Sequence, residues 1–106
     1  SGTTLELWAG KVPSVPKALD LARDGIIPAG AYRNMDFTAG DTLEDSAVPR
    51  EVLDCLYDPQ TAGGLLFSVP ERQLHALMGR MMDAGVPAVA VGAVRPRGEK
   101  LVHIKP

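Results

Sequence analysis

One amphipathic helix dominates the sequence and limits what the chain can fold into. It begins at Pro70, which suits a first helical turn, and Gly85 supplies its C-terminal stop. Its apolar side chains follow the i, i+3, i+4, i+7 spacing of a one-sided helix: Leu74, Leu77, Met78 and Met81. Directly before it, residues 65–69 form a continuous apolar run of strand length, and such runs are usually buried on both faces of a sheet. A strand followed by a helix predicts a layered domain.

The rest of the chain supplies further elements of the same kind. Alternating or β-rich segments predict strands over 3–9, 89–94 and 101–104, and helical spacing predicts helices over 15–24 and 48–56. The Pro- and Gly-containing stretch 95–100 suggests that the last two strands form a hairpin with a long loop. Residues 26–47 lose all periodicity and are expected to be loop, with extended chain around 33–38. The order predicts an α+β fold, a mixed β-sheet covered by helices.

Composition excludes several classes of function. The 106 residues fit one domain, and eleven Lys and Arg against thirteen Asp and Glu give a net charge of −2 without a basic cluster. We therefore expect no nucleic-acid partner and no membrane contact. The longest nearly apolar run, 84–94, is too short to span a bilayer and contains Pro87. A single cysteine and no secretory signal make a cytoplasmic location the default. The missing initiator Met suggests either a processed chain or a piece of a longer one.

The segment most suggestive of binding is Asp58-Pro59-Gln60-Thr61-Ala62-Gly63-Gly64-Leu65-Leu66. Paired glycines permit a close approach to the backbone, and free N–H groups from Gln60 to Gly64 would suit an anion, with the Thr61 hydroxyl as an extra donor. The alternative is a tight turn that leads into a buried strand. The residues alone favour this turn over an anion site, because short glycine motifs often occur by chance.

A second candidate is Ile27-Pro28-Ala29-Gly30-Ala31-Tyr32-Arg33-Asn34. The planar guanidinium of Arg33 suits a phosphate or a carboxylate. Its alternative role is an ion pair that fastens this loop, for example to Asp36. No other residues assemble a nucleophile, a base and an orienting group: Cys55 is expected to be an inert thiol, and the two histidines lack metal-ligand spacing.

The nine residues from Asp58 to Leu66 closely resemble the signature of the selenophosphate synthetase (selenide, water dikinase) family. Residues 27–34 are similar to a second segment of that family, and the likeness covers essentially the whole chain. It implies a fold like the C-terminal domain of aminoimidazole ribonucleotide synthetase-like proteins. Residues 1–106 would then be a single C-terminal domain of a larger two-domain enzyme whose N-terminal, ATP-binding and catalytic domain is absent here.

The resemblance also implies a reaction. Members of this family make selenophosphate, AMP and phosphate from ATP, selenide and water, with Mg²⁺ required, and selenophosphate supplies selenium for selenocysteine and selenouridine. ATP and Mg²⁺ would be bound mainly by the missing domain, and the partners would be that domain and a second subunit of a homodimer. No catalytic or metal-binding residue of the family maps onto this chain. The fragment alone is therefore expected to be inactive.

Carried over by motif, the residues facing the interdomain cleft would be Asp58, Gln60, Thr61, Gly63 and Gly64, with Arg33 and Asn34 near them. Ala62 departs from the family pattern, which usually has Ser, so any contact of that hydroxyl is lost. The same loop would alternatively serve only to dock the two domains. In isolation the docking face would be exposed, with Trp8 and Phe67 as expected contributors.

Two alternatives remain open from sequence. One is the C-terminal domain of another ATP-dependent synthetase of the same superfamily, against which the Pro-Gln-Thr stretch argues. The other is a non-catalytic binding or assembly module. A full reading frame with a Gly-rich segment carrying Cys and Lys would favour the enzyme over the module.

Overall fold

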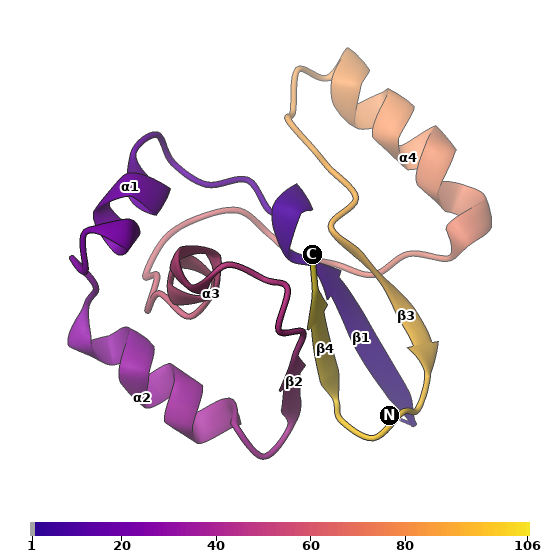
Figure 1. The fold of residues 1–106 in the computed structure, drawn as a ribbon. Coiled ribbons are helices and arrows are strands. Elements are labelled where there is room, and N and C mark those ends of the chain that lie inside the picture. Colours follow the sequence, from indigo (N-terminus) through magenta and orange to yellow (C-terminus); the bar gives the residue numbers. More distant parts are fainter. Residues whose placement is uncertain (1) are drawn as a thin grey trace.

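The computed structural model describes residues 2–106, which form a mixed four-stranded sheet with four α-helices (Figure 1). The strands are β1 (Thr3–Trp8), β2 (Thr42–Glu44), β3 (Gly92–Pro96) and β4 (Val102–Lys105). The helices are α1 (Ala18–Arg23), α2 (Ala29–Thr38), α3 (Arg50–Leu56) and α4 (Glu71–Asp83), and a short 3₁₀ turn, η1 (Ala9–Lys11), follows β1. The expected α+β class with a mixed sheet is confirmed.

The sheet has the order β2-β4-β1-β3. The central strand β1 pairs parallel to β4 and antiparallel to β3, and β2 pairs parallel to β4. Strands β3 and β4 are therefore not the predicted hairpin, because β1 lies between them. Glycine is needed at position 92, where a Cβ would collide with the backbone oxygen of Glu6 on β1.

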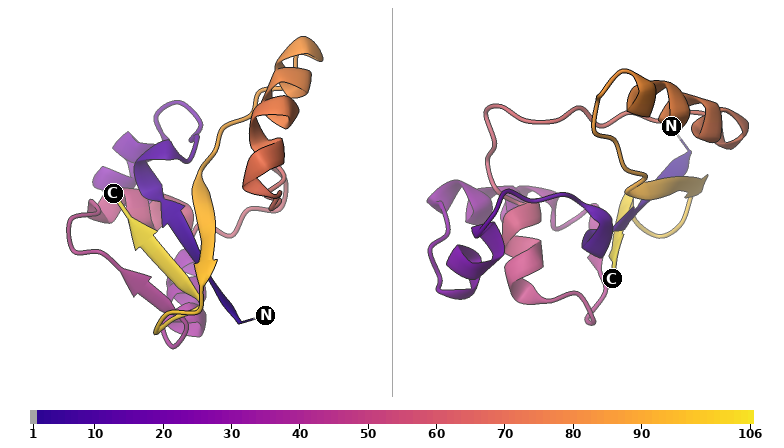
Figure 2. Two further views of the ribbon diagram at one scale, coloured as in Figure 1. Left: turned by 90° about the vertical axis from the view of Figure 1, so that its right-hand side faces the viewer. Right: turned by 90° about the horizontal axis from the view of Figure 1, so that it is seen from above.

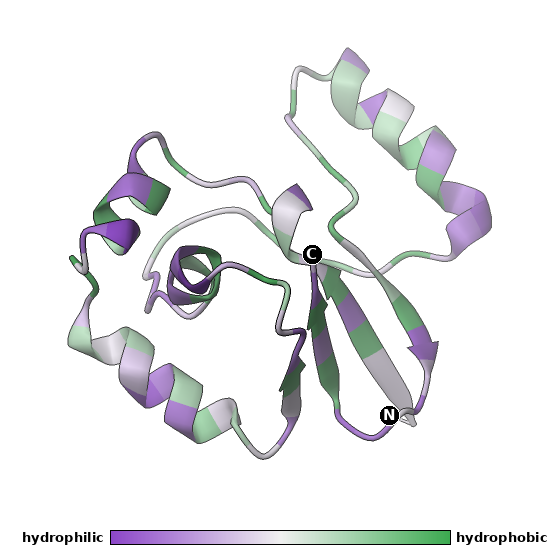
Figure 3. Cartoon of the chain, in the orientation of Figure 1, coloured by the Kyte–Doolittle hydropathy of each residue, from purple (hydrophilic) through white to green (hydrophobic). Residues whose placement is uncertain are grey.

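Three helices, α1, α2 and α3, lie on one side of the sheet (Figure 2). The core between them and the sheet consists of Ala9, Ala31, Val48, Leu53, Tyr57 and Ile104, with Leu7 and Val102 packed against it. Hydrophobic and hydrophilic residues alternate along β1 and β4 (Figure 3), so the opposite face is polar. On that face Glu6 accepts a hydrogen bond from Trp8 Nε1 at 3.0 Å and pairs with Lys105 Nζ at 3.2 Å. The helices thus cover one face, not both.

The predicted loop 26–47 is wrong in its largest part, because residues 29–38 form α2 and residues 42–44 form β2. The extended chain expected around 33–38 is helical. Pro28, in extended conformation, precedes the helix, and Gly30 and Ala31 in its first turn are buried. These small residues permit close packing of the helix, and because they are not large apolar residues, hydrophobic periodicity did not predict the helix. The expected helices 15–24 and 48–56 are present in shorter form as α1 and α3.

The predicted strand over 65–69 is also wrong. Residues 65–69 have no regular secondary structure, and Leu65, Leu66 and Phe67 are 89%, 68% and 52% exposed. The chain passes behind the outer edge of β3 on its way to α4, which lies beyond that edge and not over a sheet face (Figure 2). The radius of gyration, 14.8 Å, exceeds the roughly 13 Å typical of a compact chain of this length, as a projecting helix requires.

Candidate functional site

The structure brings the two candidate segments together at the start of α2. Gly30 lies so close to Pro59 that a Cβ on Gly30 would be 2.6 Å from Pro59 Cγ. One turn further on, Asn34 Nδ2 donates a hydrogen bond of 2.9 Å to the carbonyl oxygen of Tyr57. The beginning of α2 is therefore held against residues 57–59 by one close approach of Pro59 to the Gly30 backbone and one half-buried hydrogen bond.

The beginning of the glycine loop, residues 58–64, follows directly from the end of α3. The N–H of Asp58 donates to the carbonyl of Cys55, and the N–H of Gln60 donates to the carbonyl of Asp58 at 2.8 Å. The Gln60 N–H is thus already used, contrary to the expectation that it is free. The Gln60 side chain folds back over the loop, with Oε1 3.2 Å from where a Cβ of Gly63 would be.

The rest of this loop is open to solvent. Residues 59–64 are exposed, and within residues 2–106 the backbone N–H groups of residues 61–64 make no hydrogen bond. Thr61 likewise has no hydrogen-bonded partner in that range. Exposed, unused donors on paired glycines are compatible with an anion bound from outside, and equally with contacts to another protein surface.

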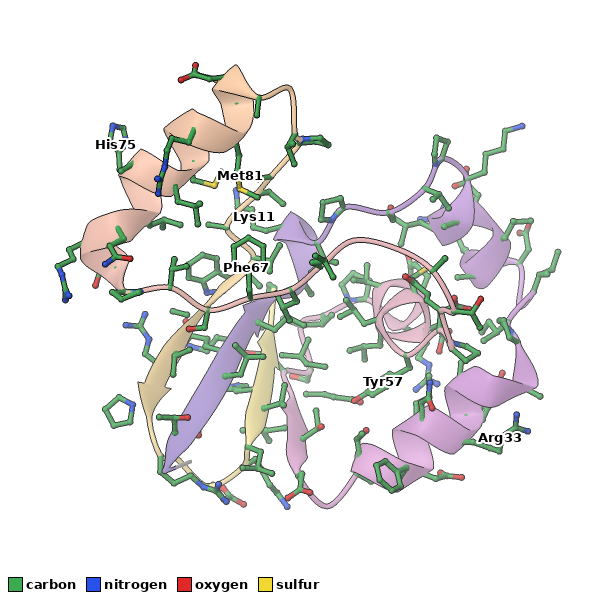
Figure 4. The ribbon with its side chains drawn as sticks, turned by 180° about the vertical axis from the view of Figure 1, so that it is seen from behind. Lys11, Arg33, Tyr57, Phe67, His75 and Met81 are labelled. Atoms are coloured by element: carbon green, nitrogen blue, oxygen red, sulfur yellow. The ribbon has the colours of Figure 1, made fainter. Side chains whose placement is uncertain are left out.

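Arg33 does not take part in this contact. It is exposed on the outer side of α2 (Figure 4), and it makes no hydrogen bond or ion pair in the part of the chain that the structure describes. The alternative of an ion pair to Asp36 is therefore absent. Of the seven residues predicted for the site, Asn34, Asp58, Gln60, Thr61, Gly63 and Gly64 lie on adjoining segments, while Arg33 points away from the body of the molecule.

Sequence reasoning missed Tyr57, which links the site to the sheet. Tyr57 is buried, its carbonyl receives Asn34, and its hydroxyl donates a 2.7 Å hydrogen bond to Glu44 Oε1 on β2. Burial, followed by the bond to Glu44, raises the pKa of the Tyr57 phenol. The only signal in the sequence was its place immediately before Asp58.

A hollow of about 320 Å³ lies between α2, α3 and the sheet, next to this contact. Its walls are Leu7, Asn34, Thr38, Thr42, Leu56, Tyr57, Val102 and Ile104. Because the Asn34 amide is held by the Tyr57 carbonyl and the Thr38 hydroxyl by the Asn34 carbonyl, the polar groups of this wall serve the fold. The hollow therefore presents few free partners to a ligand.

The thiol of Cys55 is not activated. It is half-buried on α3, and burial, followed by the neighbouring carboxylates Asp54, Asp58 and Glu51, raises its pKa. Thiolates are the reactive form, so this shift makes the thiol inert at neutral pH. The buried carboxylate Asp54 is held by Arg50, whose Nε lies 2.8 Å from Oδ1.

Metal binding has no support in residues 2–106. No group of three or more His, Cys, Asp or Glu side chains there is placed to hold an ion. His75 is exposed on α4 (Figure 4), and His103 lies on a different element, β4. In the same residues no helix is long and apolar enough to cross a membrane.

Comparison with known proteins supplies what the geometry cannot. No family model matches the chain. Among curated relatives, it is 45% identical to selenide, water dikinase 2 of Peptoclostridium acidaminophilum over 105 residues, which cover 98% of this chain. It is 40% identical to selenide, water dikinase of Geobacter metallireducens and 37% identical to that of Clostridium botulinum strain Eklund 17B, over 98% and 99% of the chain.

This chain is a homologue of the C-terminal part of selenide, water dikinases. It spans about 30% of the length of the relatives it matches. The expected resemblance is thereby confirmed, and the longer relatives imply a further domain beyond the residues described. The contact between Gly30 and Pro59 joins the two segments on which that resemblance rested.

Proposed function

We propose that this chain is the C-terminal domain of a selenophosphate synthetase, an enzyme that makes selenophosphate, AMP and phosphate from ATP, selenide and water. The single observation that carries the proposal is the match of 98% of the chain, at 45% identity, to a protein named selenide, water dikinase. The arrangement of the two motif segments supports it, because Gly30 and Pro59 bring them into contact in the fold.

In this proposal the domain contributes a wall of the interdomain cleft, in a cytoplasmic enzyme that acts as a homodimer. ATP and Mg²⁺ are held mainly by the other domain, since residues 2–106 contain no cluster of side chains that would bind a metal ion. Phosphoryl transfer depends on positioning and on neutralising charge. The exposed side chains of Gln60 and Thr61 and the free N–H groups of residues 61–64 are the groups of this chain available for such positioning.

The test is selenophosphate formation by the full-length parent, followed by ³¹P NMR with ATP, Mg²⁺ and selenide under anaerobic conditions. Gln60→Ala is compared with Gln73→Ala, a matched change at an exposed glutamine on α4. We expect Gln60→Ala to lower the rate at least tenfold at an unchanged melting temperature, and Gln73→Ala to leave it unchanged.

Two results would count against the proposal. A parent that makes no selenophosphate would indicate another ATP-dependent synthetase or a binding module. Equal rates for the two glutamine variants would confine the glycine loop to docking the domains.

A further inference from the structure

Residues 58–103 contribute no fully buried side chain to the core. All buried side chains come from residues 4–57 and from Ile104, so the described residues 58–103 contain none. Within that range eight large apolar side chains are exposed: Leu65, Leu66, Phe67, Met82, Val86, Val89, Val94 and Leu101. Contiguous exposed apolar side chains, such as those of residues 65–67, mark an interaction surface.

Part of this apolar surface is hollowed. A groove of about 400 Å³ lies between α4 and the chain that follows it, lined by His75, Met78, Gly79, Met82, Val86, Pro87 and Ala88. Hydrophobic residues continue from α4 into that chain (Figure 3), and Met82 is 75% exposed. Part of the apolar face of α4 is therefore left exposed by the described residues.

The charge pattern identifies the kind of partner. The stretches 59–70 and 84–94, on either side of α4, contain no Asp, Glu, Lys or Arg. Depletion of charged residues distinguishes the centre of a protein–protein interface from ordinary surface. Such a surface does not suit a nucleic acid or a strongly charged peptide, whose binding would need complementary charge.

The length of the relatives identifies the occupant. The matched residues make up 30% of the curated relatives, which leaves the other 70% of such a chain outside the structure. A large, uncharged surface on one part of a longer chain is what the remainder of that chain would cover. The uncharged stretch 59–70 also contains the glycine loop, so an interface there would run directly up to it.

We propose that residues 65–70 and the groove along α4 form one docking surface, against which the remainder of the parent chain packs. The inference rests on the proposed function for the existence of that parent chain. It goes further in naming the surface, and in placing the glycine loop at its rim.

Hydrogen exchange of the full-length parent tests the proposal, with a matched pair of variants. Leu65 and Phe37 are both 89% exposed, but Phe37 lies on α2, outside the docking surface. We expect Leu65→Glu to accelerate amide exchange of residues 64–70 at least tenfold in the parent, and to increase the binding of a dye specific for exposed apolar surface. Phe37→Glu should change neither.

The comparison with the 106-residue chain completes the test. Residues 64–70 should exchange at least tenfold faster in this chain alone than in the parent. Equal exchange in both, or equal effects of the two variants, would overturn the proposal. Slow exchange of residues 64–70 in the 106-residue chain alone would mean that either a second copy of the chain or its own sheet covers them. Sedimentation distinguishes these two cases, and either one contradicts the proposal. Since exchange is measured without substrate, a protected segment in a parent that makes no selenophosphate refutes the function and leaves the docking surface standing.

Discussion

Single residues decide how the two motif segments meet. Gly30 has no side chain to keep α2 away from Pro59, and the Asn34 amide satisfies a carbonyl at the end of α3. Tyr57 joins the same region to β2 through its hydroxyl. The local geometry of the candidate site therefore depends on one missing Cβ and two hydrogen bonds.

Gly30→Ala should destabilise the chain by about 1–3 kcal/mol, because the added methyl has no room beside Pro59. Gly79→Ala is the matched control: it lies inside α4 with open space around a Cβ, and should stabilise by roughly 0.5–1 kcal/mol through helix propensity. Urea unfolding measures both. Equal effects of the two substitutions would show that Pro59 moves aside at little energetic cost, which would contradict this prediction.

Tyr57→Phe should lower the free energy of unfolding by about 1 kcal/mol, since Glu44 loses its donor. The pH dependence has a definite sign. The pKa of Tyr57 is raised in the folded state. The contribution of the protonated phenol to stability is therefore complete below the pKa of the unfolded state, near 10, and is lost as the pH rises through the folded pKa. Between pH 8 and 11, the free energy of unfolding should fall less steeply with pH for Tyr57→Phe than for the unchanged 106-residue chain. Identical slopes would refute this role of the phenol.

At the scale of elements, the chain divides into a packed part and a projecting part. Helix α3 packs in the core through Leu53, and Arg23 on α1 pairs with Glu51 on α3 at 3.1 Å. Helix α4 has no buried residue, although its apolar spacing is the clearest in the sequence. Amphipathicity therefore predicted that α4 is a helix but not what covers its apolar face.

Alanine substitutions of one leucine in the packed part and one in the projecting part should differ in their effect on stability. Leu53→Ala, at a position 6% exposed, should cost about 2–5 kcal/mol in the 106-residue chain, because it leaves a cavity in the core. Leu66→Ala, at a position 68% exposed, should change the stability by less than about 0.5 kcal/mol. Chemical unfolding of both variants provides the measurement. A large loss for Leu66→Ala would mean that residues 65–69 are buried in solution.

At the scale of the whole molecule, residues 2–106 carry a recognisable motif, and they contain neither an activated cysteine nor a metal-binding cluster. Cys55 is held as a thiol by its surroundings, and no metal-binding cluster occurs within residues 2–106. The exposed polar groups of the glycine loop are an amide, a hydroxyl and backbone N–H groups, which we propose orient other molecules.

The 106-residue chain should therefore release no AMP from ATP and Mg²⁺, with or without selenide. Anion-exchange chromatography of the nucleotides after long incubation measures this, with the full-length parent as the positive control. AMP release that follows the purified chain through successive columns would contradict the assignment of the chemistry to the remainder of the parent.

The sequence by itself determined the α+β class, the helices around α1, α3 and α4, strand β1, and the motif that relates the chain to selenide, water dikinases. These features are local, because periodicity and a contiguous motif need no knowledge of distant residues. Tertiary structure alone decided that residues 29–38 are helical, since buried Gly30 and Ala31 pack where large apolar residues would be expected. It also placed β1 between β3 and β4, and left residues 65–69 outside the sheet. Strand order and burial depend on which surfaces meet, and an apolar run has the same sequence whether its own domain or another one covers it.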